Sequence, residues 1–240
     1  MCIRDRNGTF SNTERRIQRV RKAVDAPGEA KPDWQIVAAI ASKMGATGFA
    51  FENEAQIMEE IASVTPSYGG ITYERLEGGG LQWPCPTQDH LGTSTLHVEK
   101  FGTPSGKAQF MPLSFRDSAE LPDDEYPFLL TTDRSLFHYH TGSMTRRVEG
   151  LEQLDSEEFL KINPKDAASL GLEDNEVVQI ASRRGQTQAK TKVTKICPPG
   201  LVSMTFHFAE SPTNVLTSPA LDPVAKIPET KVCAVKLEKV

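Results

Sequence analysis

The pattern of hydrophobic and polar residues predicts a helical first half of the chain. Between residues 33 and 44, apolar side chains recur every three or four positions, as on one face of a helix. This face consists of Ile36, Val37, Ile40 and Met44. Pro32 precedes the helix, Asp33 can cap its first turn, and Gly45 can end it. We therefore expect one amphipathic helix here.

A second helix is predicted over residues 54–63, where Asn53 can cap the first turn. Its inner face consists of Ile57, Met58 and Ile61. Residues 72–76 predict a further short turn. The three glycines that begin at Gly78 and the stretch 83–92 then predict a long irregular loop, which in a compact domain is usually functional or disordered. The tryptophan, the prolines and the histidine in this loop argue against disorder.

The second half predicts β-strands joined by short turns. The segments that predict strands are 126–130, 176–181, 186–193, 201–206 and 232–237. Residues 182–185, Ser-Arg-Arg-Gly, predict a hairpin turn between the second and the third of them. One helix is predicted to begin at Pro164, with Asn163 as its cap, and to end at Gly171. Many short strands with little helix are typical of a small barrel.

An acidic segment, residues 121–125, is the expected linker between two domains. We expect an incomplete first domain over residues 7–119 and a β-rich second domain over residues 120–240. The opening residues, MCIRDRNGTF, are an unusual beginning for a domain. We therefore expect residues 1–6 to be foreign to the natural protein, and the rest to be the C-terminal part of a longer chain.

Composition narrows the class of protein. The 240 residues are 38% hydrophobic and 25% charged, as in an ordinary soluble globular protein. The net charge of −5 argues against non-specific binding to nucleic acid. No apolar run approaches the roughly 20 residues that a membrane-spanning helix needs.

Four scattered cysteines are typical of a reducing, cytoplasmic setting. They are Cys2, Cys85, Cys197 and Cys233. They form no C-x-x-C pair, which argues against a zinc or iron–sulfur site confined to this chain. We expect Cys197 and Cys233 to pack as small apolar side chains, and Cys85 to be an ordinary loop residue.

Residues 131–147, TTDRSLFHYHTGSMTRR, are the strongest candidate for a binding site. They follow the first predicted strand of the second half. Arginine offers a charged planar fork that suits phosphate. Serine, threonine, histidine and tyrosine add neutral donors and acceptors for a heterocycle. The loop therefore indicates a polar, anionic ligand.

Single residues of this loop leave alternatives open. His138 and His140 have the spacing of two metal ligands on a strand, but no nearby carboxylate or thiol completes such a site. They are better interpreted as donors to a bound ligand or as surface residues. Arg146 and Arg147 are either ligand contacts or a solvated pair. Arg134 follows a buried strand, where an unpaired charge is costly, so we expect it to meet an anion or a carboxylate.

A late loop, residues 207–231, is the second candidate, and it either closes over a ligand or only connects two strands. Its polar residues include His207, Asn214 and Lys231. Neither loop holds a nucleophile beside a base, a carboxylate pair or a glycine motif for phosphate. The residues therefore predict binding, without the groups that make or break bonds.

Several segments, in this order along the chain, resemble the molybdopterin-dependent oxidoreductases, and most closely the formate dehydrogenase catalytic subunits. They are Gly8–Arg16 (GTFSNTERR), Val64–Ile71 (VTPSYGGI), Pro104–Ala108 (PSGKA), His138–Arg147 (HYHTGSMTRR), Ile162–Leu172 and Ala225–Val235. The resemblance covers nearly the whole chain from Asn7. It implies a mixed α+β chain, in which the end of an α/β molybdopterin domain is followed by a double-psi β-barrel.

The resemblance also implies a cofactor, bis(molybdopterin guanine dinucleotide) with molybdenum or tungsten. The implied reaction is the two-electron oxidation of formate to carbon dioxide, or its reverse. The residues that it places at the cofactor are Arg134, Ser135, His138, Tyr139, His140, Ser143, Thr145, His207, Asn214 and Lys231. It assigns no catalytic residue and no metal ligand to this chain.

The redox ligands and partners that the resemblance implies lie elsewhere. The iron–sulfur cluster and the cysteine or selenocysteine on the metal belong to the missing N-terminal part, and electron-transfer subunits are further partners. The chain alone should be inactive. Two alternatives stay open: another molybdopterin oxidoreductase, such as a nitrate reductase, and a non-catalytic β-barrel binding module. The first region, which resembles the end of an α/β domain, weighs against the module.

Overall fold

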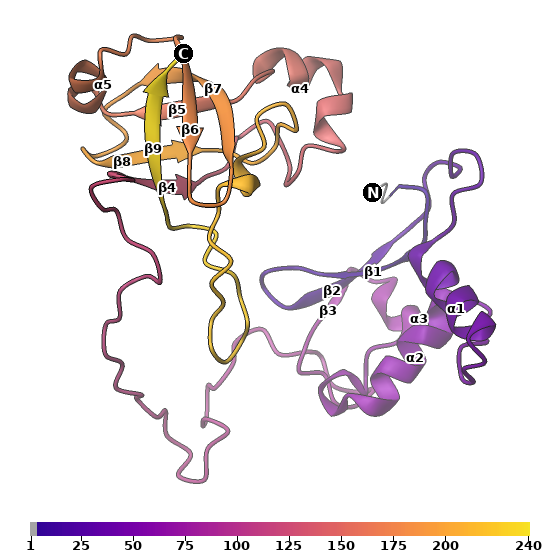
Figure 1. Cartoon of the computed structure of the whole chain (residues 1–240). Coiled ribbons are helices and arrows are strands. Elements are labelled where there is room, and N and C mark those ends of the chain that lie inside the picture. Colours follow the sequence, from indigo (N-terminus) through magenta and orange to yellow (C-terminus); the bar gives the residue numbers. More distant parts are fainter. Residues whose placement is uncertain (1–3) are drawn as a thin grey trace. The chain divides into compact units, whose positions relative to one another are not determined.

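The computed structural model of the chain describes residues 4–240, so Cys2 and the first half of the expected foreign leader lie outside the described residues. Two compact units are present, one ending at Pro112 and the other spanning Leu113–Val240 (Figure 1). The expected domain ranges, 7–119 and 120–240, stay predictions, because compactness alone does not define the domains of a family. Each unit is described by itself.

The first unit combines a three-stranded antiparallel sheet with short helices. Its strands, in sheet order, are β1 (Gly8–Ser11), β2 (Arg16–Val20) and β3 (Leu81–Gln82), and its helices are α1 (Asp33–Lys43), α2 (Glu54–Val64) and α3 (Tyr73–Leu76). The hydrophobic pattern missed the β1–β2 hairpin. Its turn depends on Asn12, whose Oδ1 accepts hydrogen bonds from the backbone N–H of Glu14 (3.1 Å) and Arg16 (2.9 Å).

The predicted helices are confirmed, with one correction at a helix start. Asn53 caps α2, because its Oδ1 accepts from the N–H groups of Ala55 and Gln56 at 3.0 and 3.1 Å. The prediction that Asp33 caps α1 was wrong. Pro32 holds the cap position, and the Asp33 carboxylate instead accepts from Arg6 Nη1 at 2.5 Å.

A small core holds the first unit together. It consists of Ile17, Met58, Ile71, Leu76 and Cys85. Cys85 was expected to be an ordinary loop residue, but its side chain is fully buried. Arg75 lies beside it, with Nη1 3.4 Å from the sulfur, and donates to the backbone oxygens of Thr87 (3.3 Å) and His90 (2.6 Å). These contacts anchor the irregular loop 83–92 to the core.

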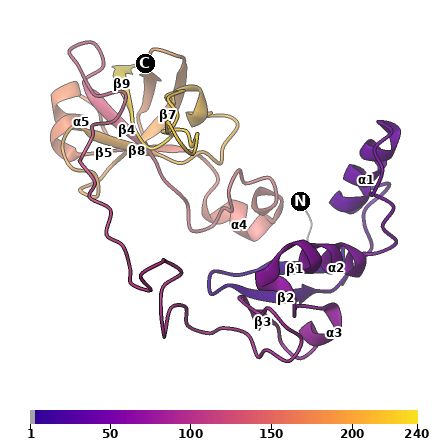
Figure 2. The same cartoon turned by 90° about the horizontal axis from the view of Figure 1, so that it is seen from below.

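The second unit is a closed barrel of six strands, in the ring order β4-β8-β5-β7-β6-β9 (Figures 1 and 2). The strands are β4 (Phe128–Thr132), β5 (Phe159–Ile162), β6 (Val177–Ala181), β7 (Gln186–Val193), β8 (Leu201–Met204) and β9 (Cys233–Lys239). The pairs β4–β8 and β5–β7 are parallel, and the other pairs are antiparallel. The strands of a parallel pair cannot be joined by a tight hairpin, so long connections separate β4 from β8 and β5 from β7 along the chain. The predicted mixed α+β chain with a small barrel is confirmed.

Two helices accompany the barrel, α4 (Glu149–Leu154) and α5 (Pro164–Leu170). α5 has the predicted signals, since Asn163 Oδ1 accepts from the Lys165 N–H (2.9 Å) and Gly171 ends the helix at φ +63°. The sequence pattern missed α4 and β5. No helix in residues 4–240 is long and apolar enough to cross a membrane.

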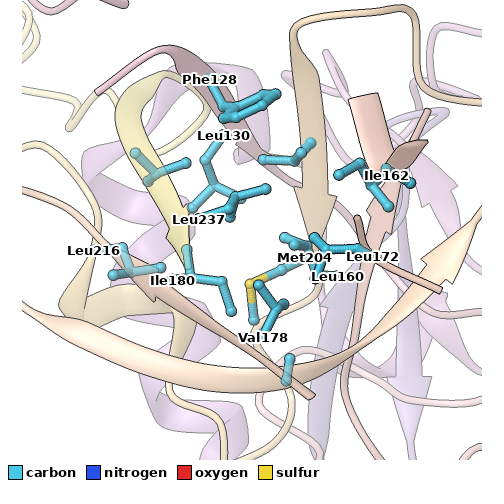
Figure 3. Packing of buried hydrophobic residues seen from close by; sticks show 14 of the residues in the cluster. Phe128, Leu130, Leu160, Ile162, Leu172, Val178, Ile180, Met204, Leu216 and Leu237 are labelled. Atoms are coloured by element: carbon cyan, nitrogen blue, oxygen red, sulfur yellow. The ribbon is translucent and has the colours of Figure 1, made fainter. Parts of the chain in front are cut away.

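Alternating side chains of the strands fill the barrel (Figure 3). Leu130, Leu160, Ile180 and Val202 are among those with no solvent exposure. Cys197 and Cys233 are buried as predicted, and burial raises the pKa of the Cys233 thiol to about 11. The strands β4, β5 and β8 lie side by side in this barrel, and the loop that leaves β4 is the candidate site.

The acidic segment before the barrel is tied to the hairpin between β6 and β7. Glu120 accepts from Arg184 Nη1 (2.5 Å) and from the Ala234 N–H (2.9 Å). Asp123 pairs with Arg183, whose guanidinium lies 4.4 Å from the centre of the Tyr126 ring. The expected linker, residues 121–125, is therefore attached to the barrel through Asp123 and through Glu120, which directly precedes it.

Candidate functional site

The candidate loop begins at a residue that three strands hold in place. The Asp133 N–H donates to the Met204 carbonyl at 2.8 Å. Asp133 Oδ2 accepts from Lys161 Nζ on β5 (2.6 Å) and from Ser203 Oγ on β8 (2.7 Å). The first residue after β4 therefore has a fixed position at one end of the barrel. Its other oxygen, Oδ1, is buried without a hydrogen-bond partner among residues 4–240.

His138 is buried, and both of its ring nitrogens are engaged within the loop. Nε2 is 2.5 Å from the Asp155 carbonyl, which can only accept, so Nε2 carries the proton. Nδ1 therefore accepts from the Thr145 hydroxyl at 3.1 Å, and the same hydroxyl accepts from the Tyr139 N–H at 3.1 Å. The ring edge packs on Phe208, with centroids 5.4 Å apart. His138 therefore stabilises the loop rather than offering a free donor.

His207 is likewise buried and joins the late loop to the candidate loop. Its Nε2 accepts from the Ser135 N–H at 3.0 Å, and its Nδ1 donates to the His140 carbonyl. Burial lowers the pKa of His207, and the charges of His138 and Arg134 act in the same direction. The hydrogen bond to the His140 carbonyl and the charge of Asp155 oppose this change without cancelling it.

Ser135 and Thr145 are also used inside the loop. The Ser135 hydroxyl donates to Asp155 Oδ2 and accepts from the Phe137 N–H at 3.1 Å. Four of the predicted site residues thus hold one another and their neighbours. We call Ser135, His138, Thr145 and His207 the frame of the loop; the two histidines are buried, and Ser135 and Thr145 are half-buried.

Arg146 closes the loop against two carboxylates. Its guanidinium donates to Glu152 (3.0 Å) and Glu210 (2.9 Å) and lies 4.8 Å from the centre of the Phe208 ring. These carboxylates raise its pKa further above the ordinary value. The Arg146 side chain packs against Gly142, which has φ +71°. The interpretation of Arg146 as one of a solvated pair was wrong, because only Arg147 of the two is exposed.

The other predicted loop residues face solvent. Arg134, Tyr139, His140 and Ser143 form what we call the exposed face of the loop. The guanidinium of Arg134 lies 4.9 Å from the centre of the Phe206 ring, and the His140 ring meets the same ring edge-on at 5.6 Å. The expectation that Arg134 meets a carboxylate was wrong for this chain, because its side chain is exposed and has no ion pair among the described residues.

A hollow of about 690 Å³ lies along this loop, lined by residues 134–140, Thr145 and Leu151. A second hollow of about 250 Å³ shares residues 134–137 and also contacts Lys161 and Glu158. Three residues of the frame (Ser135, His138 and Thr145) and three of the exposed face (Arg134, Tyr139 and His140) therefore line one recess. Within the described chain, no group of three or more histidine, cysteine, aspartate or glutamate side chains could hold a metal ion.

The two late-loop candidates differ in position. The Lys231 ammonium donates to the Thr132 carbonyl, which places its charge at the base of the candidate loop. Asn214 lies in a short 3₁₀ turn, Thr213–Val215, and is exposed. It lines neither hollow. The structure thus brings Lys231 to the loop and leaves Asn214 apart from it.

The hydrophobic pattern did not reveal three residues of this region. Asp155 accepts from Ser135 and, through its carbonyl, from His138. Glu158 is buried and accepts from the Thr205 N–H (2.9 Å) and hydroxyl (2.5 Å), which holds the segment leading to His207. Phe206 supports two members of the exposed face. An aspartate or phenylalanine in a polar loop carries no sequence signal for these contacts.

Comparison with protein families gives two matches. Residues 128–234 match the family described as Molydopterin dinucleotide binding domain, a range that runs from β4 to the beginning of β9. Residues 3–43 match the family described as Molybdopterin oxidoreductase.

Similar proteins include both formate dehydrogenases and nitrate reductases. The chain is 50% identical over 240 residues to the F420-dependent formate dehydrogenase subunit alpha of Methanocaldococcus jannaschii, covering all of this chain and 36% of that protein. It is 37% identical to the assimilatory nitrate reductase catalytic subunit of Bacillus subtilis, covering 96% of this chain and 34% of that protein. The chain thus spans about a third of the length of these relatives.

A solved structure shares the fold. Acetylene hydratase from Pelobacter acetylenicus matches 98% of this chain and 37% of its own, with a TM-score of 0.70 and 18% sequence identity. At this identity the match supports the architecture and no more.

Proposed function

The chain belongs to the molybdopterin oxidoreductases, and from this premise we propose that it is part of a formate dehydrogenase catalytic subunit. Its barrel would bind bis(molybdopterin guanine dinucleotide) carrying molybdenum or tungsten. The observation that carries the proposal is that three residues of the exposed face, Arg134, Tyr139 and His140, line the recess along loop 131–147. The 50% identity to a formate dehydrogenase alpha subunit supports the choice of reaction.

The donors of the loop fit such a cofactor. Its pyrophosphates need cationic partners, and Arg134 in the recess and Lys231, which is bound to the Thr132 carbonyl at the base of the loop, would supply them. Tyr139, His140 and Ser143 add neutral donors and acceptors for the pterin and sugar edges. When bound, the cofactor would supply the two-electron redox chemistry between formate and carbon dioxide. The residues of this chain would bind and orient it.

The frame of the loop has a different role in this proposal. Its hydrogen-bonding groups already have partners, so it would fix the loop that presents the exposed face. The iron–sulfur cluster, the protein ligand of the metal and the electron-transfer subunits would come from outside this sequence. A cytoplasmic location is part of the same proposal, and three buried free cysteines are compatible with it.

Cofactor content of the complete subunit tests the proposal. Arg134→Ala removes a cation of the exposed face, and we expect metal and guanine nucleotide content after purification to fall by on the order of tenfold, the effect of one lost charge-assisted bond. Asn214→Ala tests the late loop in the same way. The matched control is Arg147→Ala, an exposed arginine of the same loop that lines neither of the two hollows. Full cofactor loading in both test variants would contradict the assignment.

Nitrate reduction is the second candidate, favoured by the nitrate reductase relative at 37% identity. Turnover of the complete subunit with a viologen dye, given formate or nitrate, separates the two reactions. The 240-residue chain by itself should show no formate oxidation. Turnover by the pure chain would contradict the view that the redox ligands lie outside it.

A further inference from the structure

His207 joins the two ends of the loop segment 135–140, which contains Tyr139 and His140 of the exposed face. Its two ring nitrogens bind Ser135 and His140, which stand five residues apart and enclose Tyr139. His140 has φ +52°, a left-handed conformation that is unusual for a residue with a side chain. One imidazole therefore sets the distance between the two ends of this segment and helps to maintain an unfavourable backbone conformation.

The ring can make both bonds only when it is neutral. The Ser135 N–H is a donor, so Nε2 must be unprotonated, and the His140 carbonyl requires the proton on Nδ1. A second proton would place two N–H groups against each other at 3.0 Å. The ring is 2% exposed, so water cannot readily replace the lost bond.

Titratable, charged and aromatic groups surround the His207 ring. His138 lies 5.8 Å away between centroids, and Arg134 is the nearby cation on the candidate loop. Asp155 is the nearby carboxylate and is already used by Ser135. Glu158 holds Thr205, two residues before His207, and its own pKa is raised by burial. The rings of Phe206 and Phe208 cover the rest.

We propose that His207 is a positioning residue, whose neutral ring holds residues 135–140 in the conformation that receives the cofactor, and that it does not itself contact the cofactor. This inference rests on the proposed function of the loop. It assigns His207 a role different from that of Arg134 or Lys231. Protonation of the ring should release the segment and weaken the hold on the cofactor.

Retention of guanine nucleotide by the complete subunit, followed at pH 7.5 and pH 5.0, tests the proposal. The wild type should lose nucleotide on the order of tenfold faster at pH 5.0, as expected for the loss of one buried hydrogen bond. His207→Gln keeps an acceptor for the Ser135 N–H and cannot be protonated, so its loss rate should change little between the two pH values. His207→Phe should lose nucleotide rapidly at both. His97→Gln, in the first unit, is the control.

Equal pH dependence in the wild type and His207→Gln would overturn the proposal, because Glu158 or another group would then control release. Nucleotide retention in His207→Phe that matches the wild type would do the same.

An NMR titration of the 240-residue chain keeps the proposal testable if these variants fail to fold. The Ser135 amide signal should titrate together with His207, whose neutral Nδ1–H form should be visible at pH 7.5. Independent titration of the two groups would overturn the proposal. This measurement needs no cofactor. A coupled titration alongside undiminished loading in both Arg134→Ala and Asn214→Ala would therefore reject the proposed function and leave the hold of His207 on residues 135–140 intact.

Discussion

The barrel and the first unit differ in how many of their apolar side chains are buried. The barrel buries fifteen residues in one cluster, whereas the first unit buries five, so only the barrel has an extensive core. The contrast is greatest at α1, whose apolar face was clear from the sequence. No residue of α1 is buried, and Ile36, Val37 and Ile40 are about half exposed. A periodic pattern therefore identifies the face of a helix but not what, if anything, covers it.

The largest effect that this comparison predicts is in the barrel core. Leu160→Ala on β5 should lower the free energy of unfolding of the second unit by about 2–5 kcal/mol, because it leaves a cavity at a site with no solvent exposure. Both tryptophans, Trp34 and Trp83, lie in the first unit. Far-UV circular dichroism in denaturant therefore measures the loss, while tryptophan fluorescence should keep its midpoint.

The matched control is Leu136→Ala, since Leu136 is 91% exposed on the candidate loop. It should change the stability by less than about 0.5 kcal/mol. If the two variants had similar effects, or if the tryptophan transition moved with Leu160→Ala, the second unit would not have the separate core described above.

Several elements of both units were predictable because their signals are local. Asn163, Pro164 and Gly171 mark α5 within one short segment, and Asn53 caps α2 from the adjacent position. β5 was missed because it has four residues and follows Glu157 and Glu158, which do not indicate a buried strand. Glu158 is nevertheless buried, and its partner Thr205 stands 47 positions later in the chain.

The sequence singled out loop 131–147 as the candidate site, but it did not predict the contacts that its residues make. The chemistry of this loop indicated polar donors, and the structure places several of them, residues 134, 135, 138–140 and 145, along one recess. Whether a histidine is free depends on distant partners, and His207 meets Ser135 across 72 positions. Arg134 was expected to meet an anion or a carboxylate because it follows a buried strand, yet its side chain is exposed and lies over the Phe206 ring.

An intermediate loss of stability is expected at Glu120, which binds the segment before β4 to the barrel. Glu120→Ala should cost the second unit about 1–3 kcal/mol, because it leaves Arg184 and the Ala234 N–H without their shared acceptor. Burial alone would raise the pKa of Glu120, but its bonds to Arg184 and Ala234 outweigh burial and lower it.

This lowered pKa gives the sign of the pH dependence. The contribution of Glu120 should be complete above about pH 5.5 and should disappear as the pH falls through the folded-state pKa, below 4.5. Denaturant unfolding of the wild type and Glu120→Ala at pH 7 and pH 3.5 measures the difference, which should shrink at the lower pH. Glu125→Ala, an exposed carboxylate of the same segment, should behave like the wild type. A difference independent of pH would mean that packing, rather than charge, attaches the segment.

The smallest effect is expected at α1. A substitution there tests most directly whether the apolar face of this helix contributes to the stability of the first unit. Val37→Ser removes an apolar side chain that is 58% exposed, and the two residues have similar helix propensities. The free energy of unfolding of the first unit should change by less than about 0.5 kcal/mol.

The matched core variant is Ile71→Val. It removes one methylene group from the core of the same unit and should cost about 0.5–1.5 kcal/mol. Tryptophan fluorescence reports both, since Trp34 lies on α1 and its indole N–H donates to Glu54 at 3.3 Å. A loss above 1 kcal/mol for Val37→Ser would show that α1 packs against this chain in solution. The first unit would then have a larger core than the five-residue cluster seen among its described residues.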